Sequence, residues 1–180
     1  MLVITIEAKE FYDEKLEEFF ETKKQTLRLE HSLVSLSKWE AKWQKPFLTI
    51  DDKTFEETID YIRCMTITQN VDPIVYRAAS REIIKIVNEY IEDPMSATTF
   101  SKDRSKKVNK EIVTSELIYF WMFTYNISWD CQKWHLNRLL TLINVCNIKN
   151  QPQKKMSGKE QMAQRRALNA ARQKRFNTRG

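Results

Sequence analysis

The sequence predicts a mainly helical α+β fold, in which a small N-terminal antiparallel β-sheet is followed by a bundle of about five helices and a basic C-terminal helical arm. Short β-branched or alternating segments mark the start of the chain, and a helical spacing of apolar residues replaces them further on. The last thirty residues hold nine Lys and Arg against one acid. We therefore expect a single globular domain over residues 1–150, with the sheet in 1–31 and the helices in 32–150, and a separate basic arm over residues 151–180.

Three segments are predicted to form the sheet. Residues 2–6 are rich in β-branched side chains, and residues 25–31 alternate between polar and apolar side chains. Residues 18–20 are the candidate for a strand between them. The polar segment 11–16 is expected to connect the strands, and it contains no glycine or Asn-Gly turn that would fix the register of a hairpin.

Two helices are expected next. The first begins after Ser32, a typical N-cap residue, and ends at Lys45-Pro46. Its apolar stripe has spacings of three and four residues and consists of Leu33, Leu36, Trp39 and Trp43. The second helix begins near Asp52 or Thr54, and its predicted inward side chains are Phe55, Ile59, Ile62 and Met65.

A third helix is predicted over residues 74–91. Asp72-Pro73 precedes it and Asp93-Pro94 follows it, so residues that start or stop helices stand at both ends. Its predicted buried side chains are Ile83, Ile84, Val87 and Ile91. The polar segment 95–110 that comes next is expected to be a mobile loop.

The last two helices of the domain are predicted over residues 111–125 and 129–146. The first is the most apolar of the chain, with Trp121 and Phe123 on either side of Met122, and we expect it to be central in the bundle. The second has a series of apolar side chains at helical spacing, namely Trp134, Leu136, Leu139, Leu140, Leu142 and Ile143.

The residue types that common catalytic motifs require are scarce. Glycine occurs only at Gly158 and Gly180, so the glycine turns of a P-loop, a dinucleotide-binding fold and a nucleophile elbow are absent. The odd number of cysteines without CxxC spacing is typical of reduced thiols, and these residues are Cys64, Cys131 and Cys146. We therefore predict a protein that is not an enzyme and that holds no cofactor or metal.

Two weaker signals of chemistry have structural interpretations. Cys131 and His135 lie four residues apart on one predicted helix, a spacing that allows a shared metal, but two ligands are too few for a site. We interpret them as a buried cysteine and a histidine bonded to a neighbouring carbonyl. Adjacent acids diverge on a helix or a strand and are expected on solvated surface, and these pairs are Glu17-Glu18, Asp51-Asp52 and Glu56-Glu57.

No segment predicts export or membrane insertion. Residues 1–10 lack the basic start and the long apolar run of a signal peptide. Residues 112–127 are interrupted by Thr, Ser, Glu and Asn, and they do not reach the roughly 18 apolar residues that a membrane-spanning helix needs. We therefore expect a cytoplasmic protein without membrane contact.

Tryptophan side chains are the first candidates for contact with a partner. Trp39 and Trp43 can both belong to the core, or one of them can be an interface anchor, since Trp is enriched at binding hot spots. We assign Trp39 to the core and Trp43, near the helix end, to a half-exposed contact whose replacement by Ala costs little stability. Trp129 allows the same two interpretations and is a second candidate for partner binding.

The arm is the strongest functional signal. Its arginines fall on more than one side of a predicted helix, which suits the phosphates of RNA or DNA, and they are Arg165, Arg166, Arg172 and Arg175. The arm equally suits docking on an acidic protein, because small and apolar side chains permit close approach at Met162, Ala163, Ala167, Ala170 and Ala171. A third interpretation is a solvated tail that aids solubility. An isolated helix of this length is only partly formed in water, so the arm is expected to fold on a partner.

Four stretches of the chain carry a resemblance to a group of phage proteins. They are EHSLVSLSKWEAKWQKPFL, DYIRCMTITQNVDP, CQKWHLNRLLTLINVCNIKN and RRALNAARQKRFNTRG. Together they resemble a protein of the structural gene blocks of tailed phages and prophages of Gram-positive bacteria, and the resemblance covers residues 30–180. Within such blocks the chain is similar to the siphophage tail assembly chaperone, a small, largely helical protein that binds the tape measure protein during tail building and has no catalytic residues.

The resemblance implies a non-enzymatic phage morphogenesis protein that acts in the host cytoplasm, self-associates, and binds a helical partner such as the tape measure protein. One alternative is a virion component of the neck, connector or capsid whose basic arm contacts DNA or a neighbouring subunit. Another is a nucleic-acid-binding protein that uses the arginine-rich arm. The candidate partner-binding residues are Trp43, Trp129, Met162, Arg165, Arg166, Ala170, Arg172 and Arg175.

Overall fold

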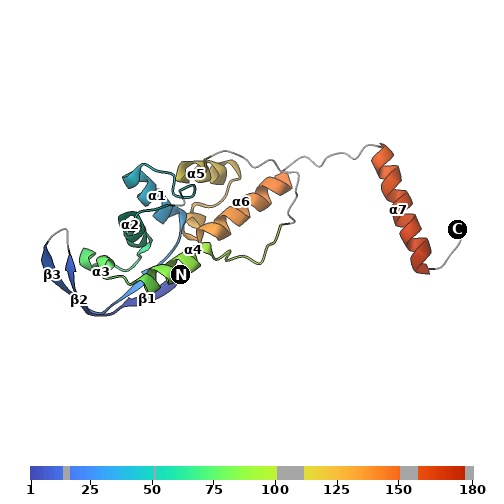
Figure 1. The fold of residues 1–180 in the computed structure, drawn as a ribbon. Coiled ribbons are helices and arrows are strands. Elements are labelled where there is room, and N and C mark those ends of the chain that lie inside the picture. Colours follow the sequence, from blue (N-terminus) through green and yellow to red (C-terminus); the bar gives the residue numbers. More distant parts are fainter. Residues whose placement is uncertain (14–16, 51, 101–111, 151–157, 177–180) are drawn as a thin grey trace. The chain divides into compact units, whose positions relative to one another are not determined.

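The computed structural model describes residues 1–13, 17–50, 52–100, 112–150 and 158–176, and the predicted mainly helical α+β class is confirmed. Contacts divide the chain into two compact units, Met1–Asn147 and Ile148–Gly180. The first unit contains all strands and most helices of the described residues, and the second contains the helix of the arm (Figure 1).

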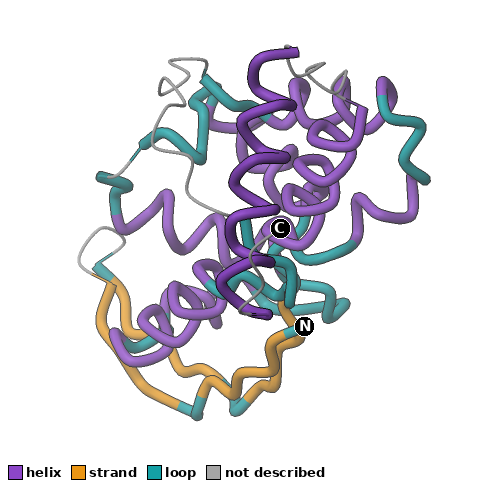
Figure 2. Tube along the Cα trace, turned by 90° about the vertical axis from the view of Figure 1, so that its right-hand side faces the viewer, coloured by secondary structure: helices purple, strands orange, loops and turns teal. Residues whose placement is uncertain are grey.

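The N-terminal strands form one interrupted hairpin. They are β1 (Leu2–Ile6), β2 (Lys9–Asp13), β3 (Glu18–Thr22) and β4 (Gln25–Leu29). β1 pairs with β4 and β2 pairs with β3, both antiparallel, and one register without a shift runs through both ladders. The strands therefore appear as a single curved ribbon in Figure 2. The expectation of a connection that begins at residue 11 is wrong, because β2 continues to Asp13, and residues 14–16 lie outside the described residues.

The two halves of the hairpin differ in burial. In the stem, β1 and β4, alternation turns one face inward, and its buried side chains are Ile4, Ile6, Leu27 and Leu29. Residues after the second helix cover the outer edge of β4, where the Ile67 backbone N–H donates a hydrogen bond to the Arg28 carbonyl at 2.8 Å. In the distal half, β2 and β3, Thr22 is buried and β3 contacts the short helix α3 (Pro73–Arg77) (Figure 1).

Helices α1 (Leu33–Trp43) and α2 (Phe55–Met65) begin where the sequence predicts. Ser32 and Thr54 are their N-caps, and each forms a capping box with the residue three positions later, Ser35 and Glu57. Phe55, expected to point inward, is 58% exposed. The inward face of α2 is rotated away from it because the helix buries polar as well as apolar side chains, namely Glu57, Asp60, Tyr61, Ile62 and Met65.

The single helix predicted over residues 74–91 is two helices, α3 and α4 (Arg81–Glu92). Ser80 separates them, since its hydroxyl accepts a hydrogen bond from the Ile83 backbone N–H at 3.3 Å and so caps a new helix. Val87 is buried as expected, while Ile83, Ile84 and Ile91 are partly buried.

The later helices start later than expected or are interrupted. They are α5 (Ser115–Thr124), the 3₁₀ helix η1 (Trp129–Lys133), α6 (Leu136–Asn150) and α7 (Gly158–Phe176). The predicted helix 129–146 is broken because His135 forms a β-bridge with Ser32 and the Leu136 backbone N–H donates to the His31 carbonyl at 2.7 Å. Of the predicted mobile loop, residues 101–110 lie outside the described residues.

The core joins the hairpin stem to α1, α2, α5 and α6. Its fully buried side chains include Trp39, which confirms the assignment of this residue to the core. The others are Ile6, Leu27, Leu29, Leu33, Leu36, Ile62, Met65, Ile118, Met122, Leu136 and Leu139. The centre of the first unit is therefore apolar, and the polar groups described below enter it at defined points.

Candidate protein-binding surfaces

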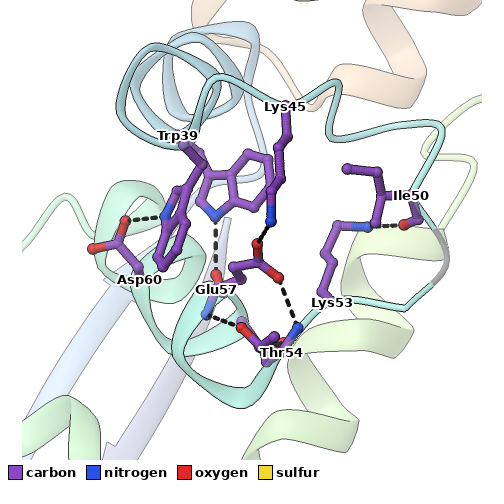
Figure 3. Close-up of polar contacts among 9 residues, drawn as sticks. Trp39, Lys45, Ile50, Lys53, Thr54, Glu57 and Asp60 are labelled. Atoms are coloured by element: carbon purple, nitrogen blue, oxygen red, sulfur yellow. Dashed lines mark hydrogen bonds and ion pairs between the residues drawn. The ribbon is translucent and has the colours of Figure 1, made fainter.

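Trp39 and Trp43 lie together at the contact between α1 and α2, where Figure 3 shows Trp39 beside Glu57. The Trp39 indole N–H donates to the Glu57 carbonyl at 2.9 Å, and its ring stacks on that of Trp43 with centroids 6.1 Å apart. The half-buried Trp43 donates its indole N–H to Asp60 Oδ2 at 2.9 Å. Lys42 and Lys45 place their ammonium groups over the Trp43 ring, at 5.4 Å and 5.9 Å from its centroid. Trp43 is therefore held within the fold as well as partly accessible.

Replacing Trp43 with Phe is expected to lower the free energy of unfolding by about 1 kcal/mol, because the bond to Asp60 is lost while a ring stays on Trp39. Replacing it with Ala removes both contacts and is expected to cost about 2–3 kcal/mol. Urea unfolding of the two variants measures these differences. An Ala variant as stable as the wild type would contradict this structural role and return Trp43 to the contact role expected from the sequence.

Glu57, expected on solvated surface, is buried beneath this corner with 2% exposure. Its Oε1 accepts a hydrogen bond from Lys45 Nζ at 2.6 Å, and its Oε2 accepts one from the Thr54 backbone N–H at 2.7 Å (Figure 3). The bond from the Lys45 ammonium, followed by that from Thr54, holds the pKa of Glu57 below its usual value. The other described acids of the three adjacent acidic pairs are exposed as expected, and they are Glu17, Glu18, Asp52 and Glu56. Asp51 lies outside the described residues.

Glu40 is a buried carboxylate that the sequence did not single out for a role. It is 7% exposed, and it accepts hydrogen bonds from the Phe47 backbone N–H at 2.9 Å and the Ser115 backbone N–H at 2.7 Å. Thr114, the N-cap of α5, makes no side-chain capping bond, so Glu40 of α1 satisfies the first turn of α5 instead. We call this arrangement the Glu40 clamp, and it positions α5 against α1.

The two histidines of the chain meet in the core. The rings of His31 and His135 are 5.1 Å apart, and His31 Nδ1 shares a hydrogen bond of 2.6 Å with the Tyr61 hydroxyl. His135 Nε2 lies 3.0 Å from the Tyr90 carbonyl, which can only accept, so Nε2 carries the proton. This confirms the expected histidine bonded to a carbonyl, and Cys131 is buried as expected. The expectation that Cys131 and His135 lie on one helix is wrong, because Cys131 lies in η1 and His135 lies in the extended link between η1 and α6.

Within the described residues, no three His, Cys, Asp or Glu side chains come close enough together to hold a metal ion. Burial lowers the pKa of His31 to about 3, with the neighbouring His135 as a further cause. His135 Nδ1 is buried without a hydrogen-bond partner among the described residues. Both observations describe side chains that are packed in the core.

A cluster of exposed aromatic side chains lies on α5 and η1. Phe120, Phe123 and Trp129 are 60%, 77% and 57% exposed, and we call these three residues the aromatic surface. Phe120 and Phe123 are about 60° apart around the helix, on the side opposite the buried Ile118 and Met122. The helix that was expected to be central therefore contributes only one of its sides to the core. The physical reason is the Glu40 clamp, which fixes the side of α5 that faces the core.

Tyr119 connects the two parts of the aromatic surface. Its ring is 5.8 Å from that of Trp129, and it lies one turn before Phe123 on α5. Its hydroxyl donates a hydrogen bond to Gln132 Oε1 of η1 at 3.1 Å. The contacts of Trp129 do not overlap those of Trp43, so these two predicted partner-binding residues do not form one site.

The predicted residues of the arm lie on α7. Met162 is 65% exposed, and the other described members of the set are exposed as well, namely Arg165, Arg166, Ala170 and Arg172. Arg175 is in the last turn of the helix, and its side chain lies outside the described residues. The arm thus offers arginine, alanine and methionine side chains to a partner.

None of the helices in the described part of the chain combines the length and the apolar character needed to cross a membrane. No protein-family model matches the chain, and neither the curated proteins nor the solved structures that were compared with it gave a match.

Proposed function

We propose that this chain is a non-enzymatic phage morphogenesis protein that acts like a tail assembly chaperone in the host cytoplasm. It binds a helical partner, such as the tape measure protein, through the aromatic surface. The resemblance of residues 30–180 supports the phage origin. The exposure of Phe120 and Phe123 on α5 and of Trp129 on η1, which contacts α5 through Tyr119, is the observation that carries the binding role.

The physical argument starts from the cost of exposed aromatic rings. Burying a large aromatic ring contributes about 1.5–3 kcal/mol of favourable free energy, which a ring exposed to water does not provide. A cluster of such exposed rings on a folded domain is typical of an interaction site. Aromatic side chains are also those that most often act as anchors in an interface. The Glu40 clamp and the Tyr119 contact hold α5 and η1 in place, so the anchors are preorganised.

A helical partner fits this surface because a rigid helix with exposed rings on one side can pack into the apolar stripe of another helix. The predicted binding is therefore apolar in character and only weakly dependent on salt. The basic arm offers a second, salt-dependent contact.

Replacing Phe120, Phe123 and Trp129 together with Ser is expected to abolish co-purification of co-expressed tape measure protein, since burial of three rings is lost. The matched control replaces Phe55 and Ile86, which are exposed on α2 and α4, with Ser. Both variants should unfold at temperatures close to that of the wild type, because all five side chains are exposed.

Retention of the partner by the aromatic-surface variant would count against this site, and loss of the partner by the control as well would indicate nonspecific binding. No complex with the wild type would count against the chaperone role.

A virion component is the second candidate, and the exposed arginines of α7 favour it because they suit DNA or a neighbouring subunit. Mass spectrometry of purified mature particles, compared with the infected-cell lysate, separates the two roles. The chaperone role predicts presence in the lysate and absence from particles. Many copies in each particle would instead support a virion subunit.

A further inference from the structure

The distal half of the hairpin presents one face away from the body. Pairing places Tyr12 opposite Phe19, with ring centroids 4.9 Å apart, and Glu10 opposite Glu21. Alternation along each strand puts both pairs on the same face, and all four side chains are exposed. On the opposite face Thr22 is buried. We call the four exposed residues the hairpin face.

The two glutamates of the hairpin face are a like-charge pair directly across the strands, which destabilises a hairpin. Neither carboxylate has an ion-pair partner among the described residues. Where the hairpin bends, by contrast, Lys24 Nζ is 2.9 Å from Glu7 Oε1, so opposite charges do meet nearby. A glutamate pair beside two exposed rings is suited to a partner that is both cationic and partly apolar.

The arm carries that complementary chemistry. Arg165 and Arg172 are seven residues apart, so they lie along one side of α7, about 10 Å from one another. Met162 and Leu168 are 65% and 51% exposed on the same helix. Arginine bonds carboxylates in pairs of hydrogen bonds and also packs on aromatic rings. Residues 151–180 carry nine basic side chains against one acid, whereas acids outnumber bases in the rest of the chain.

We propose that the chain self-associates head to tail, with the arm of one copy docked on the hairpin face of a second copy. The arginines of the arm bind Glu10 and Glu21, and its apolar side chains cover Tyr12 and Phe19. Docking also supplies the contacts that a 19-residue helix needs to be fully formed. The inference does not depend on the proposed function, since the aromatic surface takes no part in it.

The two surfaces of this contact are different, so each added copy leaves one hairpin face and one arm unused. Association therefore closes into a ring, of which two copies that exchange arms form the smallest, or continues into an open filament. Light scattering of the full chain, freed of nucleic acid, is expected to show a mass above that of the monomer, which rises with concentration and falls with added salt.

Charge reversal tests the residues. The hairpin variant, Glu10→Arg with Glu21→Arg, keeps a like-charge pair and so leaves hairpin stability nearly unchanged. It is expected to weaken self-association by roughly 100-fold, because like charges then face the arm. The matched control, Glu89→Arg with Glu92→Arg, makes the same change of net charge at exposed positions of α4 and is expected to associate like the wild type.

Mixing two variants tests the direction of the contact. The arm variant, Arg165→Gln with Arg172→Gln, is expected to be monomeric alone, as is the hairpin variant, and its two neutral side chains cannot pair with the new arginines of the hairpin variant. The hairpin variant retains a native arm and the arm variant retains a native hairpin face, so the mixture is expected to form a one-to-one complex that does not grow.

Three results would overturn the proposal: a wild-type chain that stays monomeric, a mixture of the two variants that forms no complex, or a control variant that dissociates like the hairpin variant. Loss of the wild-type assembly on removal of nucleic acid would overturn it as well and would assign the arm to nucleic-acid binding.

Discussion

Replacing Glu40 with Ala is expected to lower the free energy of unfolding by about 3 kcal/mol. The carboxylate is 7% exposed and accepts hydrogen bonds from the backbone N–H groups of Phe47 and Ser115. Both donors lie in the interior, and a buried donor left without an acceptor costs about 1–3 kcal/mol. The loss is therefore larger than expected for an average helix substitution.

The matched variant Glu40→Gln keeps one carbonyl oxygen and so retains one of the two bonds. It is expected to lose about half as much stability as Glu40→Ala, in urea unfolding at neutral pH. Because the clamp fixes the side of α5 that faces the core, amide hydrogen exchange of α5 should also accelerate in the Ala variant. Equal stability of the Ala variant and the wild type would show that the clamp is not needed.

Stability is expected to fall by about 2 kcal/mol between pH 6.5 and pH 5, because His31 resists protonation in the folded state. Burial lowers the pKa of His31 to about 3, whereas an unfolded histidine titrates near pH 6.5. Between these two values the unfolded chain binds the extra proton, so acid favours unfolding. The contribution of His31 is complete above pH 6.5 and is lost progressively as the pH falls towards 3.

The groups around His31 account for this behaviour. His135 packs against its ring, Tyr61 bonds its Nδ1, and Tyr90 packs on His135 while its hydroxyl donates to Glu30. No carboxylate bonds His31 among the described contacts, so nothing compensates a charge on its ring. Free carboxyl groups titrate near pH 4, below the interval from pH 6.5 to pH 5.

The variant His31→Gln removes the titrating ring, and its stability is expected to vary less between pH 6.5 and pH 5. Tyr61→Phe keeps the ring and should retain most of the wild-type pH dependence at lower absolute stability. The measurement is urea unfolding of the three proteins at several pH values. An unchanged slope in His31→Gln would contradict the assignment.

Three helix starts could be predicted from the sequence because capping is local. Ser32, Thr54 and Asp72 each bond a backbone N–H two or three residues later, and no distant part of the chain is required. The stripe of α1 was also correct up to Trp39. The short β2 strand was missed because its pairing with β3 follows from register across a tip without a glycine, which the local pattern does not encode.

The candidate sites were only partly predictable, because they depend on contacts between distant residues. Glu40 lies four residues after Leu36, on the inward side of α1, and a charged residue at such a position was the available signal. Its partner Ser115 is 75 residues away and could not be identified. The exposure of Phe123 could not be predicted for a similar reason. α5 is apolar on all sides, so its sequence pattern does not show which side faces the core, and the contact with Glu40 that fixes this side is distant in sequence.

The measurement that tests the proposed function most directly is photo-crosslinking from Phe123. A benzoylphenylalanine at position 123 is introduced in cells that express the phage genes, with position 55 as the control, because Phe55 is also an exposed ring on a helix. The account predicts a crosslink from position 123, and not from position 55, to a long helical partner identified by mass spectrometry as the tape measure protein. The absence of any crosslink from position 123, or the same products from both positions, would contradict it.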